Sequence, residues 1–260
     1  MAGILGHAEK MVTEFHNFVS DPVNNPFLLS VAVVLLSSFV ILVLFAINSR
    51  KGRRQGILLL GLCDSGKTLL YSLLTQKRMV LTHTSIRENQ GKYEIKQSKK
   101  ATHAVIVDLP GHERIRTKYI KKYEDMARGI IFMVDSAAFP KQIRDIAEYL
   151  YDVFANKILM SSKPSVLVVC NKQDIPTAKS ANVIKSQLEK EIHEMRFTRA
   201  AALKGTDDMH SKRDVDVGKK GKVFEFGQLQ GKINFIECSI GTEDSVGVGI
   251  ICEWIEKTVM

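Results

Sequence analysis

One short segment carries the residue pattern that binds nucleotide phosphates. Residues 61–68 read Gly-Leu-Cys-Asp-Ser-Gly-Lys-Thr, a complete G-x-x-x-x-G-K-[ST] loop. The two glycines permit a tight turn whose backbone N–H groups point at phosphate oxygens. The lysine would neutralise the β and γ phosphates, and the threonine hydroxyl would bind Mg²⁺. The candidate ligands in this loop are Gly61, Asp64, Ser65, Gly66, Lys67 and Thr68.

A second segment, Asp108-Leu109-Pro110-Gly111-His112, contains the D-x-x-G pattern of nucleotide hydrolases. Asp108 would hold Mg²⁺ through water, and the Gly111 amide would sense the γ-phosphate. His112 stands where a residue that orients the attacking water is expected. The alternative is that His112 only occupies an exposed turn.

A third segment selects the base. Asn171-Lys172-Gln173-Asp174 forms an N-K-x-D pattern after a buried apolar run. The Asp174 carboxylate can accept hydrogen bonds from N1–H and the 2-amino group of guanine, whereas adenine offers no such donor pair. Lys172 would lie along the base and Asn171 would brace the loop. The pattern therefore predicts GTP rather than ATP.

The elements that position these motifs alternate between strands and helices. Each motif follows an apolar run that reads as a buried strand, and an amphipathic helix follows the phosphate-binding loop. This alternation predicts a doubly wound, mainly parallel α/β sheet with the nucleotide at the carboxyl ends of its strands. The expected strands are 56–60, 92–97, 104–107, 129–134, 165–170 and 233–237.

A separate apolar segment precedes this domain. Residues 27–47 contain no charge, and at about 1.5 Å per residue they are long enough to span a bilayer core of roughly 30 Å. Lys and Arg gather directly after it, at 50–54, so the positive-inside rule places the N-terminus outside and the following domain in the cytosol. We expect a short segment at 1–26, a transmembrane helix at 27–47, a basic linker at 48–55 and a nucleotide-binding domain at 56–260.

Composition narrows the class of protein further. The formal net charge is +9, but the basic residues are spread over several loops and no nucleic-acid recognition motif accompanies them. We therefore expect no sequence-specific nucleic-acid binding. The four cysteines show no metal-ligand spacing, which is consistent with a reducing compartment.

Taken together, the motifs in this order resemble the small GTPase superfamily. The match to its Arf and Sar branch is loose, since that branch lacks a transmembrane helix. The layout is more similar to the family of signal recognition particle receptor β subunits, through GLCDSGKT, TSIREN, DLPGHERIR, NKQD and a basic insertion at about 199–232. The resemblance implies an endoplasmic reticulum membrane GTPase that uses GTP and Mg²⁺. It also implies the receptor α subunit as partner, with a task in docking ribosome–nascent-chain complexes and a contact with the ribosome or translocon.

The same resemblance suggests further site residues. Ser239 and Ile240 match the last guanine loop of small GTPases, where a serine side chain and the next backbone amide contact the base. A threonine before the second strand would bind Mg²⁺; Thr84 is the first choice and Thr82 remains an alternative. With a histidine at 112 and no identifiable arginine finger, we expect slow or partner-stimulated hydrolysis, so that the nucleotide acts as a binding switch.

Two points stay open at this stage. Residues 204–222 are predicted to form a surface loop, either solvated or in contact with ribosomal RNA or lipid. The alternative function is an Arf/Sar-like membrane-traffic GTPase, which the permanent membrane helix disfavours because traffic GTPases need reversible attachment. The apolar stripe of the last expected helix, at 244–259, should pack on the sheet.

Overall fold

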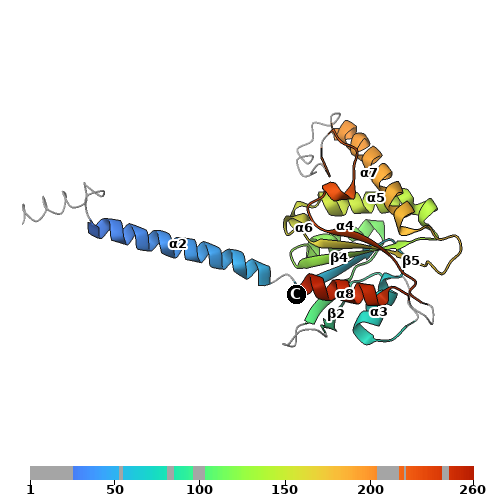
Figure 1. Cartoon of the computed structure of the whole chain (residues 1–260), viewed down its shortest axis with the longest axis horizontal. Coiled ribbons are helices and arrows are strands. Elements are labelled where there is room, and N and C mark those ends of the chain that lie inside the picture. Colours follow the sequence, from blue (N-terminus) through green and yellow to red (C-terminus); the bar gives the residue numbers. More distant parts are fainter. Residues whose placement is uncertain are drawn as a thin grey trace, which may run out of the picture. The chain divides into compact units, whose positions relative to one another are not determined.

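A computed structural model of the chain describes residues 26–52, 55–80, 85–95, 103–203, 217–219, 221–241 and 246–260. The chain divides into two compact units, Met1–Arg53 and Arg54–Met260 (Figure 1). Each unit is described by itself below.

The described part of the first unit is one helix, α2, Pro26–Gly52. Its side chains between residues 30 and 45 are exposed, including Leu35 at 65% and Phe39 at 66%. Among the residues that the structure describes, none of the helices combines the length and apolarity of a membrane-spanning segment. The transmembrane helix expected at 27–47 therefore stays a prediction.

The second unit is built on a six-stranded sheet of order β2-β3-β1-β4-β5-β6 within its described residues. β2 runs antiparallel to β3, and the remaining neighbours are parallel. The strands are β1 Gly56–Gly61, β2 Asn89–Glu94, β3 His103–Asp108, β4 Ala127–Asp135, β5 Ser165–Asn171 and β6 Ile233–Glu237.

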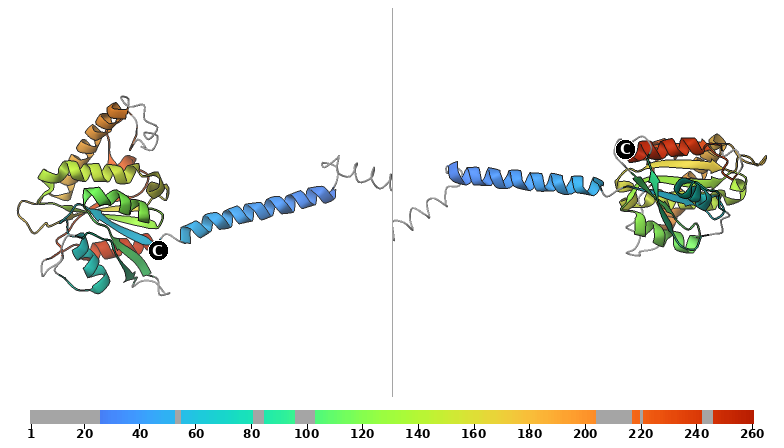
Figure 2. Two further views of the ribbon diagram at one scale, coloured as in Figure 1. Left: turned by 180° about the vertical axis from the view of Figure 1, so that it is seen from behind. Right: turned by 90° about the horizontal axis from the view of Figure 1, so that it is seen from below.

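Helices cover both faces of this sheet, and a separate apolar core fills each side (Figure 2). One core joins the sheet to α4, α5, α6 and α7, and the other joins it to α3 and α8. The predicted doubly wound, mainly parallel fold is confirmed. The helices are α3 Lys67–Gln76, α4 Glu113–Tyr123, α5 Phe139–Ala155, α6 Lys157–Ser161, α7 Ala181–Leu203 and α8 Val248–Val259.

The second strand differs from its prediction. We expected it at 92–97, but β2 covers Asn89–Glu94, so it begins three residues earlier. Its register explains the difference, because Asn89 lies opposite Asp108 at the end of β3. Because the first residue of β2 is polar, the apolar pattern did not indicate that the strand begins there.

The basic insertion is also more ordered than predicted. Its first residues, from Arg199 to Leu203, extend α7, and residues 204–216 lie outside the described residues. Val217, Phe224 and Phe226 are buried in the core on the α5 and α7 side of the sheet. The predicted surface loop at 204–222 is therefore wrong at Val217, because an apolar side chain there packs inward.

Candidate functional site

The phosphate-binding loop connects the end of β1 to the start of α3. Gly61 and Gly66 adopt φ angles of 136° and 96°, in the left-handed region that favours glycine. A Cβ on Gly61 would lie 2.3 Å from the carbonyl oxygen of Met133, and one on Gly66 would lie 2.4 Å from Nδ2 of Asn171. Both glycines are therefore required by conformation and by space, as the motif predicts.

Lys67 lies inside the curve of this loop. Its ammonium donates to the carbonyl oxygen of Leu62 at 2.6 Å and lies 3.5 Å from the Ser65 hydroxyl. Only 6% of Lys67 is exposed, and burial lowers the pKa of its ammonium, against the opposing attraction of Asp108. A buried cation whose hydrogen bonds, within the described part of the chain, go to neutral oxygens is suited to neutralising phosphate oxygens.

Gly111 packs directly against the same loop. A Cβ on Gly111 would lie 2.6 Å from the carbonyl oxygen of Gly61 and 2.7 Å from the backbone nitrogen of Cys63. The D-x-x-G segment thus reaches the phosphate-binding loop, as its proposed role at the γ-phosphate requires.

Four oxygen-bearing side chains meet beside the start of α3. The Thr68 hydroxyl donates to Asp108 Oδ2 at 2.9 Å and lies 3.0 Å from the Ser85 hydroxyl. Asn89 donates to the same carboxylate oxygen at 3.2 Å. Thr82 and Thr84, the predicted threonine ligands of Mg²⁺, lie outside the described residues.

These residues fit Mg²⁺, which prefers oxygen ligands and is often held by one carboxylate together with substrate phosphates. Asp108 is fully buried, and its Oδ1 has no hydrogen-bond partner in the described part of the chain. Burial raises the pKa of Asp108, while hydrogen bonds from Thr68 and Asn89 oppose the change. A divalent cation would satisfy both the free oxygen and the buried charge.

His112 caps the N-terminus of α4. Its Nδ1 accepts the backbone N–H of Arg114 at 3.3 Å, and the side chain is exposed. A neutral ring that accepts at Nδ1 carries its proton on Nε2, so it can orient a water as a donor. Arg116 lies in α4, four residues after His112. It is buried over the Tyr149 ring and is therefore not available to act as an arginine finger.

Asn171 joins the phosphate loop to the last guanine loop. Its Nδ2 donates to the carbonyl oxygen of Ser65 at 3.0 Å, and its Oδ1 accepts the backbone N–H of Ile240 at 3.0 Å. The side chain is 1% exposed. These two hydrogen bonds are those that a bracing role would need, and the Ile240 amide, expected at the base, is donated to Asn171.

Asp174 and Ser239 form the edge that would read the base. The Ser239 hydroxyl donates to Asp174 Oδ1 at 2.9 Å, which fixes the carboxylate. Lys172, with a φ of 64°, pairs with Asp135 Oδ2 at 2.6 Å. The other oxygen of Asp135 accepts two backbone N–H groups, from Ala137 and Ala138. All predicted base-site residues therefore meet at the carboxyl ends of β5 and β6.

The sequence analysis missed three residues of this site. Ser85 lies before β2 and Asn89 is the first residue of β2, in a region where only threonines were considered as ligands. Asp135 ends β4, one position before the turn that contacts the N-K-x-D loop. An aspartate at the carboxyl end of a strand was the available signal for Asp135, whereas no motif marked Ser85 or Asn89.

Comparisons with known proteins give the family. The family model described as "Signal recognition particle receptor beta subunit" matches residues 52–233. The receptor subunit beta from Mus musculus is 42% identical over 238 residues, which cover 90% of this chain and 88% of the mouse protein.

Solved structures agree with this assignment. A structure titled "The Structure of the Mammalian SRP Receptor" aligns with a TM-score of 0.68 at 38% identity, over 78% of this chain and 99% of that chain. A complex titled with SRb-GTP and SRX, from Chaetomium thermophilum, aligns with a TM-score of 0.62 at 22% identity, over 78% and 98%. At that identity, the second likeness shows the fold alone.

Proposed function

The chain belongs to the family of signal recognition particle receptor β subunits, and on that premise we propose that it is a membrane-anchored, GTP-dependent binding switch. The observation that carries the proposal is the guanine site. Asn171 links the phosphate loop to the base loop through two hydrogen bonds, and Ser239 fixes the carboxylate of Asp174.

Selection of GTP rests on Asp174. With Oδ1 accepting the Ser239 hydroxyl, the carboxylate keeps lone pairs for N1–H and the 2-amino group of guanine. Adenine has no such donor pair, so these lone pairs would be left without hydrogen bonds. A site built to hydrogen-bond its substrate discriminates against an analogue without the donors by several orders of magnitude. ATP would therefore bind far more weakly than GTP.

Mg²⁺ would be held by Thr68 and Asp108, with a hydroxyl from the segment before β2 nearby. Thr84 is proposed as the ligand from this segment, with Thr82 as alternative. The Ser85 hydroxyl, from the same segment, lies 3.0 Å from the Thr68 hydroxyl. When bound, the ion would offset phosphate charge. Asn89 and Thr68 keep the Asp108 carboxylate in place for it.

Hydrolysis is proposed to be slow in the isolated protein. His112 is exposed at the start of α4 and would orient a water only once a partner encloses it. Arg116 is committed to Tyr149 and Asp152, so a stabilising arginine would have to come from elsewhere. The nucleotide state would then persist long enough to control binding.

Residues 27–47 are proposed to anchor the chain in the endoplasmic reticulum membrane, with the N-terminus in the lumen. The supporting observation is a helix whose apolar side chains, such as Leu36, Ile41 and Phe45, are exposed in succession. The basic cluster at 50–54 would lie on the cytosolic side.

The proposed partner is the receptor α subunit, bound through the segments around Ser85 and His112 in the GTP form. Ribosome or translocon contact would follow from docking of ribosome–nascent-chain complexes. Support comes from the family, since the matched family model and the mouse relative are both named as the beta subunit of a receptor, which implies a further subunit.

The test is nucleotide-dependent capture. The domain at residues 54–260 is loaded with GTP, GDP or ATP, and binding to the receptor α subunit is measured. We expect capture with GTP alone, and loss of capture in Asp174→Asn. Equal capture in all three nucleotide conditions would overturn the proposal, as would tighter binding of ATP than of GTP.

A further inference from the structure

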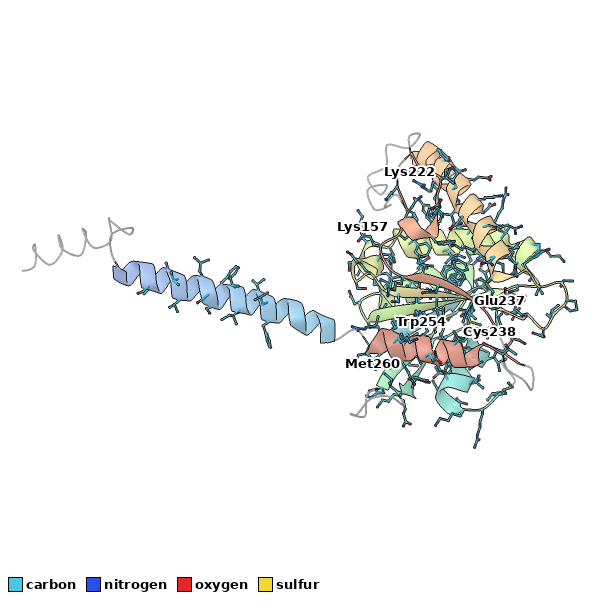
Figure 3. All side chains as sticks on the ribbon, viewed as in Figure 1. Lys157, Lys222, Glu237, Cys238, Trp254 and Met260 are labelled. Carbon is cyan, nitrogen blue, oxygen red and sulfur yellow. The ribbon has the colours of Figure 1, made fainter. Side chains whose placement is uncertain are left out.

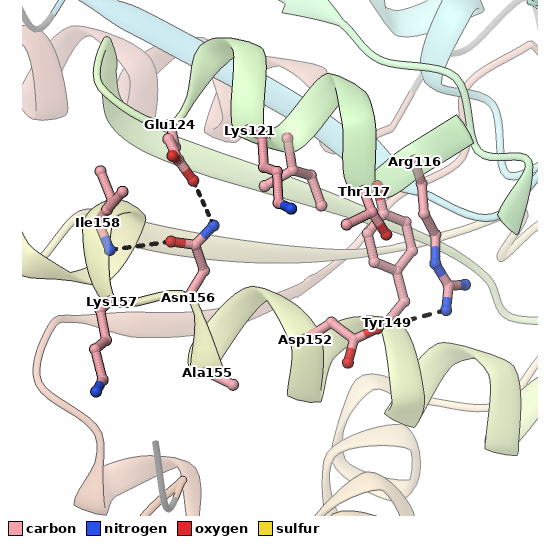
Figure 4. A pocket seen from close by; sticks show the side chains of 11 residues that line it. Arg116, Thr117, Lys121, Glu124, Tyr149, Asp152, Ala155, Asn156, Lys157 and Ile158 are labelled. Carbon is pink, nitrogen blue, oxygen red and sulfur yellow. Dashed lines mark hydrogen bonds and ion pairs between the residues drawn. The ribbon is translucent and has the colours of Figure 1, made fainter. Parts of the chain in front are cut away.

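A cavity of about 520 Å³ lies between α4, α5 and the start of α6, outside the nucleotide site (Figure 4). Ile120 and Ala155 contribute apolar walls, and the Tyr149 ring forms part of the lining. This volume is in the range of ligand pockets. None of the residues proposed to bind the nucleotide lines it.

The cavity has a net positive lining. Its two carboxylates are already used: Glu124 accepts Nδ2 of Asn156 at 2.6 Å, and Asp152 pairs with Arg116 at 3.7 Å. Asp152 also accepts from Arg199 at 2.9 Å. These acids are therefore not available to a ligand.

Two lysines at the cavity have no such partner. Lys121 and Lys157 are exposed, and neither forms an ion pair with a carboxylate among the described residues. Beneath them, the fully buried Tyr149 hydroxyl has no hydrogen-bond partner in the same part of the chain. Two available cations and a buried polar group indicate a ligand that combines anionic oxygens with apolar groups.

The position of the cavity indicates the source of that ligand. α4 and α5 run from the nucleotide edge of the sheet to the opposite edge, where the cavity residue Glu124 is two positions from Met126. The Met126 carbonyl accepts the backbone N–H of Gly56 at 3.0 Å, and Gly56 is the first residue of β1. The part of the cavity lined by Glu124 thus lies near the edge of the sheet where β1 begins.

The two edges of the sheet are separated within the domain. Figure 3 shows Lys157 and Met260 on one side, and Glu237 and Cys238 at the nucleotide edge on the other. On the side of Lys157, the apolar side chains of Ile158 and Met260 are 49% and 60% exposed. Exposed apolar groups beside lysines suit the interface of an anionic bilayer.

We propose that the cavity between α4, α5 and α6 binds the headgroup of an anionic phospholipid at the surface of the membrane that anchors the chain. Lys121, whose side chain points into the space between the helices, contacts the phosphate (Figure 4). Lys157 points away from Lys121 and attracts the anionic surface beside the cavity, where Ile158 enters the interface. This inference rests on the membrane anchor of the proposed function, but its test needs neither the anchor nor a partner.

The test uses the domain at residues 54–260, which contains both cores and corresponds to a relative's solved chain covered to 99%. Its sedimentation with phosphatidylcholine vesicles, with or without phosphatidylserine, is measured. We expect binding only with phosphatidylserine. Lys121→Gln with Lys157→Gln should weaken it about 25-fold, at about fivefold per basic residue.

The matched control carries Lys141→Gln and Lys185→Gln, which remove two exposed lysines from the first turns of α5 and α7, near the nucleotide edge. It should bind the vesicles like the unchanged domain. Equal weakening in both variants would show non-specific attraction and overturn the proposal, as would equal binding to pure phosphatidylcholine.

Two further measurements test the cavity itself. Thr117→Trp places a large ring at its exposed mouth and should weaken vesicle binding while GTP affinity is unchanged. Unchanged vesicle binding in this variant would overturn the site. Soluble glycerophosphoserine should displace the domain from the vesicles only weakly. If the domain bound it as tightly as it binds the vesicles, the membrane would be excluded as the source of the ligand.

Discussion

Replacing Asn171 with alanine separates two loops that the nucleotide needs together. The side chain is 1% exposed and makes two hydrogen bonds of 3.0 Å, to the Ser65 carbonyl and from the Ile240 amide. Alanine leaves both backbone groups buried without partners, and each such group costs about 1–3 kcal/mol. The free energy of unfolding should therefore fall by about 2–6 kcal/mol.

The assay is urea unfolding of the domain at residues 54–260, with and without GDP, together with the rate of nucleotide release. Asn171→Ala should lower the unfolding midpoint and speed release, because the phosphate and base loops lose their common support. Asn171→Asp keeps the acceptor for Ile240 but places a buried carboxylate against the Ser65 carbonyl oxygen, so its loss of stability should be at least as large as that of Asn171→Ala.

Asn156→Ala is the control. Asn156 caps α6 by accepting two backbone N–H groups at 3.0 Å and donates to Glu124 at 2.6 Å; it precedes β5, whereas the guanine loops follow β5 and β6. Its removal should cost about 1 kcal/mol for the N-cap and about 1–3 kcal/mol for the bond to the carboxylate, without changing nucleotide release. If Asn171→Ala unfolded within 1 kcal/mol of the unchanged domain and released GDP at the same rate, the reasoning would be refuted.

Four other changes have defined outcomes. Tyr149→Phe removes a buried hydroxyl that has no hydrogen-bond partner among the residues the structure describes, so differential scanning calorimetry of the ligand-free domain should show an unchanged or higher melting temperature. The hydrogen bond from Lys122 lowers the pKa of Glu88 from its ordinary value of 4.5 to about 2. The Glu88–Lys122 pair therefore contributes to stability above pH 4.5, and this contribution is lost as the pH falls toward 2. Acid unfolding of Glu88→Gln should lack that pH dependence. Asp108→Asn, or chelation of Mg²⁺, should weaken GTP binding in isothermal titration, and Mg²⁺ should no longer strengthen binding to the variant. Asp174→Asn should weaken GTP about a hundredfold or more while xanthosine triphosphate, which presents an acceptor to the new amide, gains affinity.

The motifs predicted much of the site because each one ends a strand. Gly66, Asp108 and Asp174 follow or end apolar runs, and parallel strands bring their carboxyl ends to one edge. The order of the motifs and the hydrophobic pattern therefore sufficed to place them together.

What escaped prediction lacked such a pattern. β2 starts on the polar Asn89, and its position is set by pairing with Asp108 rather than by its own composition. Val217 and Phe224 are buried although they lie among lysines and glycines. Their burial depends on α7, whose residues Glu189 and His193 accept the backbone N–H groups of Phe226 and Phe224.

The link between Asn171 and Ile240 also sets the order in which the site can be completed during synthesis. The phosphate-binding loop leaves the ribosome first, but Ile240 and Ser239 follow β6, the last strand in chain order. Until they emerge, the Asn171 Oδ1 lacks the Ile240 N–H that donates to it, and Asp174 lacks the Ser239 hydroxyl that orients its carboxylate. Domains fold as units as they emerge, so the nascent chain would hold nucleotide firmly only after β6 is added to the sheet.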